Sequence, residues 1–136
     1  MSREPISVLL ADEHTLYREA LALSLAHASS ITVAGQCGNG PEARQLFHTL
    51  QPDILLVDIT VRAERGFATT HQVLTEYPDA KVIWISTFFV EAYSRRISEA
   101  GTRGYLTKSM SYLDIVEAIH KVQAGEIFIG DKIQQD

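Results

Sequence analysis

The stretch Ile54-Leu55-Leu56-Val57-Asp58 decides the fold, because four large apolar residues run directly into a carboxylate. So short and apolar a run is typical of a strand that is buried on both faces, as in a parallel sheet covered by helices. The carboxylate stands where this strand leaves the core. In an open parallel sheet, ligands and chemistry collect at that edge, beyond the carboxyl ends of the strands. Asp58 is therefore the candidate centre of a functional site.

Strand and helix patterns alternate along the rest of the chain. We expect further strands at residues 6–11, 31–37, 81–86 and 104–107, and helices at 15–28, 41–50, 67–77, 90–100 and 112–124. This alternation predicts a three-layer (βα)5 domain of the α/β class with a parallel sheet. In the first helix we expect Thr15 as the cap, and Leu16, Ala20 and Leu23 share one face at helical spacing. A loop is expected from residue 59 to Gly66.

Composition narrows the class of protein. The chain has 136 residues, 46% of them hydrophobic, which predicts one folded domain with a sizeable core. Its formal net charge of −5 does not favour nucleic acid as a direct partner. The single cysteine, Cys37, excludes an internal disulfide, and no segment has the ~18 apolar residues of a membrane span. We expect a cytoplasmic domain without a membrane anchor.

Polar residues follow the strands in a consistent way. Asp12 and Glu13 follow the first strand, Asp58 ends the third, Ser86 ends the fourth and Lys108 follows the fifth. With right-handed crossovers the three acids cluster at one edge, where their repulsion favours a bound Mg²⁺. A carboxylate beside such a cation can act as a nucleophile toward a phosphoryl group. A hydroxyl and an ammonium are suited to hold the phosphoryl oxygens.

Five pieces of the sequence together resemble a two-component response regulator receiver domain. They are Leu10-Ala11-Asp12-Glu13-His14, Leu55-Leu56-Val57-Asp58 with Gly66 eight residues later, Ile85-Ser86, and Gly104-Tyr105-Leu106-Thr107-Lys108. The stretches 11–21, 101–108 and 124–128 are similar to the NarL/LuxR (FixJ) subfamily. The resemblance implies a flavodoxin-like fold with the strand order 2-1-3-4-5.

The resemblance also implies roles for individual residues. Asp58 would accept a phosphoryl group from a histidine kinase or a small phosphodonor. Mg²⁺ would be held by Asp12, Glu13, Asp58 and the backbone carbonyl of Thr60. Such a domain is not an enzyme in the usual sense, although it assists its own phosphorylation and dephosphorylation.

By the same resemblance, Ser86 and Tyr105 occupy the positions of the family's switch residues, which sense the phosphoryl group. Ser86 and Lys108 would bind the phosphoryl oxygens, and the Tyr105 ring would follow the Ser86 hydroxyl inward. The resulting surface change implies a homodimer on activation. We expect a receiver domain at residues 4–125 and the start of a linker at 126–136, leading to a C-terminal helix-turn-helix domain that this chain lacks. DNA would be contacted only through that domain.

Several positions depart from the family pattern. Glu13 replaces the usual Asp, Val61 and Arg62 replace a Met-Pro pair, and Thr87 replaces a smaller residue. Arg62 would add a cation beside the metal site. These departures leave open an alternative, a pseudo-receiver that acts as an interaction module with a poorly phosphorylated site. His14 lies near the acids and is a candidate to touch the site.

Two enzyme or cofactor alternatives are disfavoured. A phosphatase of the haloacid dehalogenase type would carry a second Asp two residues after the nucleophile, where this chain has Thr60. A flavodoxin-like flavin site would need a phosphate-cradling loop after the first strand, where Asp12 and Glu13 would instead repel phosphate.

Overall fold

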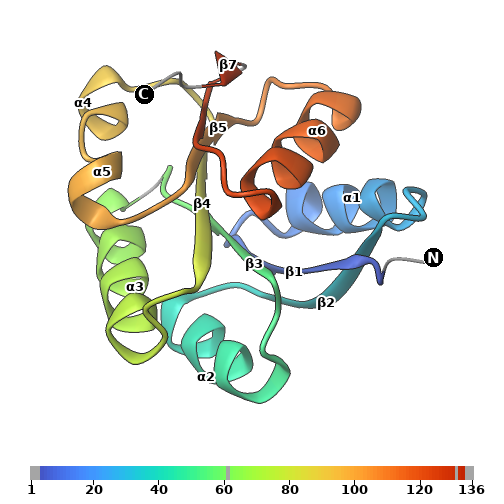
Figure 1. Cartoon of the computed structure of the whole chain (residues 1–136), viewed down its shortest axis with the longest axis horizontal. Coiled ribbons are helices and arrows are strands. Elements are labelled where there is room, and N and C mark those ends of the chain that lie inside the picture. The colour runs from blue at the N-terminus through green and yellow to red at the C-terminus, as the bar shows by residue number, and fades with distance from the viewer. Residues whose placement is uncertain (1–3, 61, 131, 134–136) are drawn as a thin grey trace.

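The computed structural model describes residues 4–60, 62–130 and 132–133. Its seven strands form one sheet in the order β2-β1-β3-β4-β5-β6-β7, in which all neighbours are parallel except the last pair (Figure 1). The strands are β1 (Ile6–Ala11), β2 (Ile31–Cys37), β3 (Ile54–Asp58), β4 (Lys81–Ser86), β5 (Gly104–Thr107), β6 (Phe128–Ile129) and β7 (Lys132–Ile133). The predicted α/β class, the first five strands and the order 2-1-3-4-5 are confirmed.

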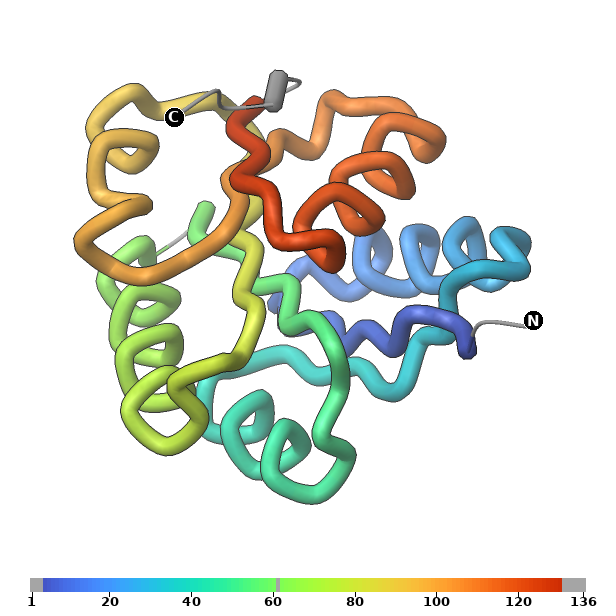
Figure 2. Tube along the Cα trace, in the orientation of Figure 1, coloured from blue at the N-terminus to red at the C-terminus, as the bar shows by residue number. Residues whose placement is uncertain are grey.

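The helices cover both faces of the sheet. They are α1 (Thr15–Ala26), α2 (Gly40–Leu50), α3 (Ala63–Glu76), α4 (Glu91–Ser94), α5 (Ile97–Ala100) and α6 (Tyr112–Gln123). One core contains residues of α1 and α6, and the other contains residues of α2, α3 and α5. Figure 2 shows the same division, with β3 running through the middle of the molecule between the two groups of helices. Leu55 and Val57 face one core and Ile54 and Leu56 the other, which explains why β3 is apolar at every position but its last.

The buried side of α1 differs from the expected stripe. Leu16 and Leu23 are 80% and 71% exposed, whereas Leu21, Ala22 and Leu25 are buried. The helix carries two apolar stripes, and spacing alone does not say which one meets the sheet. Its N-cap is His14 rather than Thr15, and the His14 side chain makes no capping hydrogen bond.

The helix after β3 begins earlier than predicted. Residues 63–66 are helical, so the predicted loop to Gly66 is wrong in its second half. Gly66 serves close packing within the helix, because a Cβ there would lie 2.4 Å from Cγ2 of Ile59.

The predicted helix over 90–100 is interrupted and forms the two short helices α4 and α5. The Arg96 guanidinium stacks over the Phe67 ring at 4.2 Å, and Tyr93 meets that ring edge-on. These tertiary contacts with α3 hold the two halves where a continuous helix was expected. Gly101 ends the second half with φ +80, as predicted.

The end of the chain contributes to the sheet, which we did not predict. The Phe128 side chain is buried, and β6 pairs with β5 in parallel while β7 returns antiparallel to β6. Residues 128–129 therefore extend the sheet beyond β5.

Candidate functional site

The carboxyl ends of the first five strands bring four of the predicted site residues to one edge of the sheet. Asp12 follows β1, Asp58 ends β3, Ser86 ends β4 and Lys108 follows β5. The pairing of β3 with both β1 and β4 places Val57 beside Ala11 and Asp58 beside Ile85. The position of Asp58 at the centre of this edge thus follows from the sheet topology.

Lys108 forms ion pairs with both aspartates. Its Nζ lies 2.9 Å from Oδ2 of Asp12 and 3.4 Å from Oδ1 of Asp58, and the three side chains are 9%, 7% and 4% exposed. Its backbone N–H donates to the Ser86 carbonyl at 2.8 Å, and its ammonium lies 4.7 Å from the centre of the Tyr17 ring. A buried cation thus stands among the carboxylates, where it offsets their repulsion.

Burial raises the pKa values of Asp12 and Tyr17 beside the lysine. The pKa of Asp12 is raised chiefly by loss of hydration, and the negative charge of Asp58 adds to the shift, while the hydrogen bonds from Lys108 and from the His14 backbone oppose it. Burial and then the two carboxylates raise the pKa of Tyr17 to about 12, so its ring stays neutral beneath the lysine.

His14 also lies within the acidic cluster. Its Nδ1 is 3.2 Å from Oδ1 of Asp12, 3.4 Å from Oδ2 of Asp58 and 2.8 Å from Nζ of Lys108. The His14 backbone N–H donates to Oδ1 of Asp12 at 2.8 Å, which fixes that carboxylate. Asp12, His14 and Asp58 together form a set of groups able to hold a metal ion.

Thr60 binds the candidate phosphoacceptor directly. Its backbone N–H and its hydroxyl both donate to Oδ1 of Asp58, at 3.1 and 2.6 Å. The Thr87 backbone N–H in turn donates to Oγ1 of Thr60 at 3.0 Å. Thr87 therefore supports the loop after Asp58. The sequence interpretation used only the Thr60 carbonyl and missed this role of its side chain.

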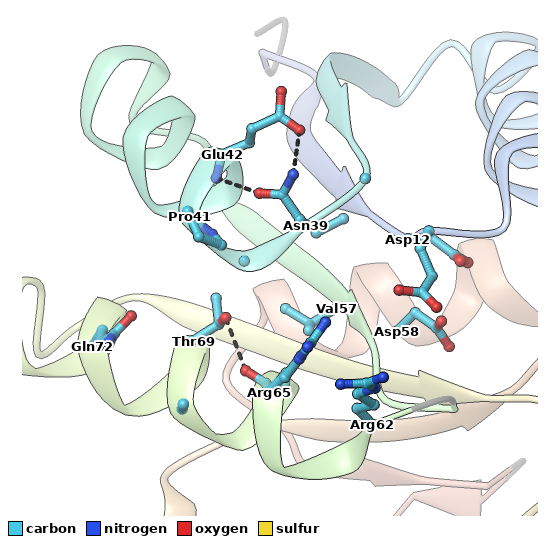
Figure 3. Close-up of a pocket in the computed structure, with 16 residues that line it drawn as sticks. Asp12, Asn39, Pro41, Glu42, Val57, Asp58, Arg62, Arg65, Thr69 and Gln72 are labelled. Atoms are coloured by element: carbon cyan, nitrogen blue, oxygen red, sulfur yellow. Dashed lines mark hydrogen bonds between the residues drawn. The ribbon is translucent and has the colours of Figure 1, made fainter.

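Glu13 lies at the side of the acidic cluster. It is exposed and lines a cavity of about 740 Å³ that also contains Asp12 and Asp58. Arg62 and Arg65 line the same cavity from the start of α3, and Figure 3 shows Arg62 close to Asp58. The expected cation beside the site is thus present, whereas the departure at Val61 lies outside the described residues.

Ser86 and Tyr105 form a buried hydrogen-bond network next to the acids. The two hydroxyl oxygens are 2.8 Å apart, and Ser86 also donates to the Phe88 carbonyl. The Tyr105 hydroxyl accepts from the Val90 backbone N–H at 2.9 Å, and its ring is fully buried. The Ser86 hydroxyl is directed toward this network.

A doubly wound parallel sheet in the order 2-1-3-4-5, with its charged site beyond the carboxyl ends of the strands, is a flavodoxin-like arrangement. The model of the response regulator receiver domain matches residues 8–120, and the chain belongs to this family. It is accordingly a receiver domain of the two-component systems, which is a signalling protein rather than a classical enzyme. Receiver domains bind Mg²⁺ at an acidic pocket.

Curated relatives support the assignment of the chain to the receiver family. The chain is 32% identical over 130 residues to the response regulator GacA of Pseudomonas aeruginosa, covering 96% of this chain and 61% of that protein. It is 29% identical over 133 residues to the transcriptional regulatory protein DegU of Brevibacillus brevis, covering 98% and 56%. The chain thus spans about three fifths of the length of the curated relatives that it matches.

Solved structures agree in fold. A two-component response regulator of the LuxR family from Aurantimonas sp. SI85-9A1 superposes with a TM-score of 0.85 at 25% identity, covering 92% of this chain and 89% of that one. The signal receiver domain of NarL from Mycobacterium tuberculosis gives a TM-score of 0.82 at 26% identity, covering 90% and 99%. Within the described part of the chain, none of the helices combines the length and apolarity needed to cross a bilayer.

Proposed function

We propose that the chain is a phosphorylation-dependent switch whose phosphoacceptor is Asp58. The observation that carries the proposal is the buried contact of Asp58 and Asp12 with Lys108 at the carboxyl edge of the sheet. An oxygen of Asp58 would form a bond to phosphorus while the bond from phosphorus to the donor breaks. The donor would be a phosphohistidine of a histidine kinase or a small phosphodonor. Lys108 would pair with a phosphoryl oxygen and stabilise the charge that develops there.

The oxygen ligands at this edge fit a Mg²⁺ ion, because carboxylates and a carbonyl are the groups that Mg²⁺ prefers. Asp12, Glu13, Asp58 and the Thr60 carbonyl would hold it. When bound, the ion would neutralise phosphoryl charge. Glu13 lies in the cavity that opens onto the aspartates, which supports its inclusion.

The response to phosphorylation would begin at Ser86. A phosphoryl oxygen on Asp58 would compete with the Phe88 carbonyl for the Ser86 hydroxyl, and Tyr105 shares a hydrogen bond with that hydroxyl. Movement of Ser86 would therefore change the loop from Phe88 to Val90, which Tyr105 also holds. A local charge change would in this way alter the surface of α4, β5 and α6.

The wider role follows from the relatives. We infer that a histidine kinase is the partner in the cytoplasm, that activation favours a homodimer, and that an attached DNA-binding domain delivers the output. The receiver would occupy residues 4–125, with residues 128–129 added to its sheet as β6, and the chain beyond them would lead toward that domain. Assisted dephosphorylation of Asp58 would reset the switch.

Beryllofluoride with Mg²⁺ tests the assignment of Asp58, because it mimics a phosphorylated aspartate. We expect amide NMR shifts around Asp58, Ser86 and Lys108 in the wild-type protein, and mass labelling of Asp58 by acetyl phosphate. Asp58→Asn should lose both responses, whereas Asp79→Asn, at an exposed position, should keep them. A folded wild-type protein without either response would contradict the proposal.

The pseudo-receiver remains the second candidate, and one observation favours it. His14 and Lys108 already contact both aspartates, so an incoming cation and phosphoryl group must compete with existing partners. In that case beryllofluoride would leave the spectrum unchanged while an interaction with a partner protein persisted in Asp58→Asn.

A further inference from the structure

Two arginines at the start of α3 face the cavity that opens onto Asp58. Arg62 stands directly before α3 and Arg65 lies in its first turn, where the Arg65 N–H donates to the Arg62 carbonyl at 2.9 Å. Both line the cavity together with Asp58, and Figure 3 shows their side chains extending from α3 toward the end of β3. Cations at the start of a helix oppose its dipole. The stability of α3 therefore does not account for the two guanidinium groups.

The acids of the cavity leave these guanidinium groups available to a ligand. Among the described residues, none of the ion pairs involves Arg62 or Arg65. Lys108 already pairs with the two aspartates. The Glu42 carboxylate accepts a hydrogen bond from the Asn39 side-chain amide at 2.9 Å, and Figure 3 shows it turned away from Arg65. The two arginines thus present positive charge to whatever enters the cavity.

The cavity has room for a small molecule beside Asp58. Its volume of about 740 Å³ lies within the ~300–1,000 Å³ typical of ligand pockets. Part of its wall is made of small or neutral side chains, among them Ala68, Thr69 and Gln72. Glu13 also lines it and would be paired with the Mg²⁺ ion of the proposed function. A phosphoryl group on Asp58 would fill only a part of this space, so the remainder of a phosphodonor would fit next to it.

We propose that this cavity is a donor pocket, in which Arg62 and Arg65 bind the acyl group of a small acyl phosphate. In the transfer an oxygen of Asp58 forms the new bond to phosphorus, and the bond from phosphorus to the bridging oxygen breaks. The bridging oxygen keeps the electron pair of that bond, so the acyl group leaves as a carboxylate and no proton is needed. Guanidinium groups bind carboxylates through paired N–H donors, and they would stabilise the negative charge that develops on the leaving oxygen.

The inference rests on the proposed function, because it takes Asp58 as the acceptor, and it goes further by naming the class of donor. A donor with a neutral leaving group should gain nothing from the arginines. Phosphoramidate is such a donor, since its P–N bond breaks and ammonia leaves. A comparison of the two donors therefore separates an effect on the leaving group from an effect on Asp58 or on the fold.

Labelling of Asp58 by acetyl phosphate and by phosphoramidate, each with Mg²⁺ and followed over time by mass spectrometry, tests the donor pocket. We expect Arg62→Gln and Arg65→Gln each to slow labelling by acetyl phosphate about threefold, and the double variant about tenfold, as for exposed ion pairs. Labelling by phosphoramidate should not become slower in any of these variants. Added salt should slow labelling by acetyl phosphate more in the wild-type protein than in the double variant, because it screens exposed charges.

Arg95→Gln is the matched control, since Arg95 is exposed at the end of α4 and does not line the cavity. It should leave both rates unchanged. An equal loss with the two donors would overturn the proposal, because the arginines would then act on the phosphoryl group or on the fold. Unchanged labelling of the double variant by acetyl phosphate would also contradict the donor pocket, and it would leave the phosphoacceptor role intact. If neither donor labels the folded wild-type protein, the phosphoacceptor role and the donor pocket are both refuted.

Discussion

The Tyr105 hydroxyl fastens the loop after β4 to the core. It donates to Oγ of Ser86 at 2.8 Å and accepts from the Val90 N–H, and it lies 3.2 Å from the Phe88 carbonyl oxygen. Phe89 stacks on the same ring, with centroids 5.0 Å apart. The residues that follow the site are thus held by one phenol group.

Tyr105→Phe should destabilise this loop, because it leaves partly buried polar groups without their partner. We expect a loss of about 1–3 kcal/mol in the free energy of unfolding. Hydrogen exchange at the Val90 amide should accelerate. Urea denaturation and amide exchange measured by NMR check both effects.

Tyr112→Phe is the control, since among the described residues the Tyr112 hydroxyl makes no hydrogen bond. It should change stability by less than about 0.5 kcal/mol. Unchanged Val90 exchange in Tyr105→Phe would mean that the loop is held by other contacts.

For single residues, the sequence predicted where the site residues lie in the fold better than where their side chains point. Asp12, Asp58, Ser86 and Lys108 could be placed at one edge because strand ends are set by short-range patterns. His14 could be named only as a candidate to touch the site, because no local pattern sets the inward turn of its ring. It depends on the backbone of the loop after β1, where His14 has φ −79 and ψ 88, and on the Asp12 carboxylate that holds its N–H.

Among the helices and strands, α1 shows that a pattern of apolar residues can leave undecided which face of a helix is buried. Leu16 and Leu23 share an exposed face, although they have the spacing of a core stripe. The segment from 90 to 100 likewise divides in two where Tyr93 and Arg96 pack on the Phe67 ring of α3. Contacts with residues far along the chain take part in setting such a boundary, and local propensity does not contain them.

Leu25→Ala and Leu23→Ala test which face of α1 carries the stability. Leu25 is fully buried, so its truncation should cost about 2–5 kcal/mol. Leu23→Ala should change the free energy of unfolding by less than about 0.5 kcal/mol. Urea midpoints of the two variants provide the measurement, and comparable losses would show that both stripes are covered.

At the scale of the whole molecule, residues beyond 125 take part in the fold. Phe128 is 3% exposed and lies in the core shared by α1 and α6. The sequence indicated only a change of composition there, because a two-residue strand is too short to produce a periodic pattern. Whether the segment also begins a linker stays a prediction.

Phe128→Ala should therefore behave as a core mutation and cost about 3–5 kcal/mol. Ile127→Ala is the neighbouring control, with 36% of Ile127 exposed, and should cost clearly less. Thermal and urea unfolding of both variants check the difference. Near-equal small effects would show that residues 126–129 lie outside the cooperative unit.

The short strands at the end of the sheet also affect how readily copies of the protein associate through their sheet edges at high concentration. The outer side of β5 is hydrogen-bonded to β6, which is only two residues long. The strand β7 follows it and pairs with β6 in the antiparallel direction. At the opposite border, the pairing of β2 with β1 shifts register between Val8 and Leu9, which interrupts a regular ladder. Short and irregular borders are poor templates for intermolecular strand addition. Assembly of this domain should therefore proceed through side chains on its helices, and fibrous aggregation should be slow even in concentrated solution.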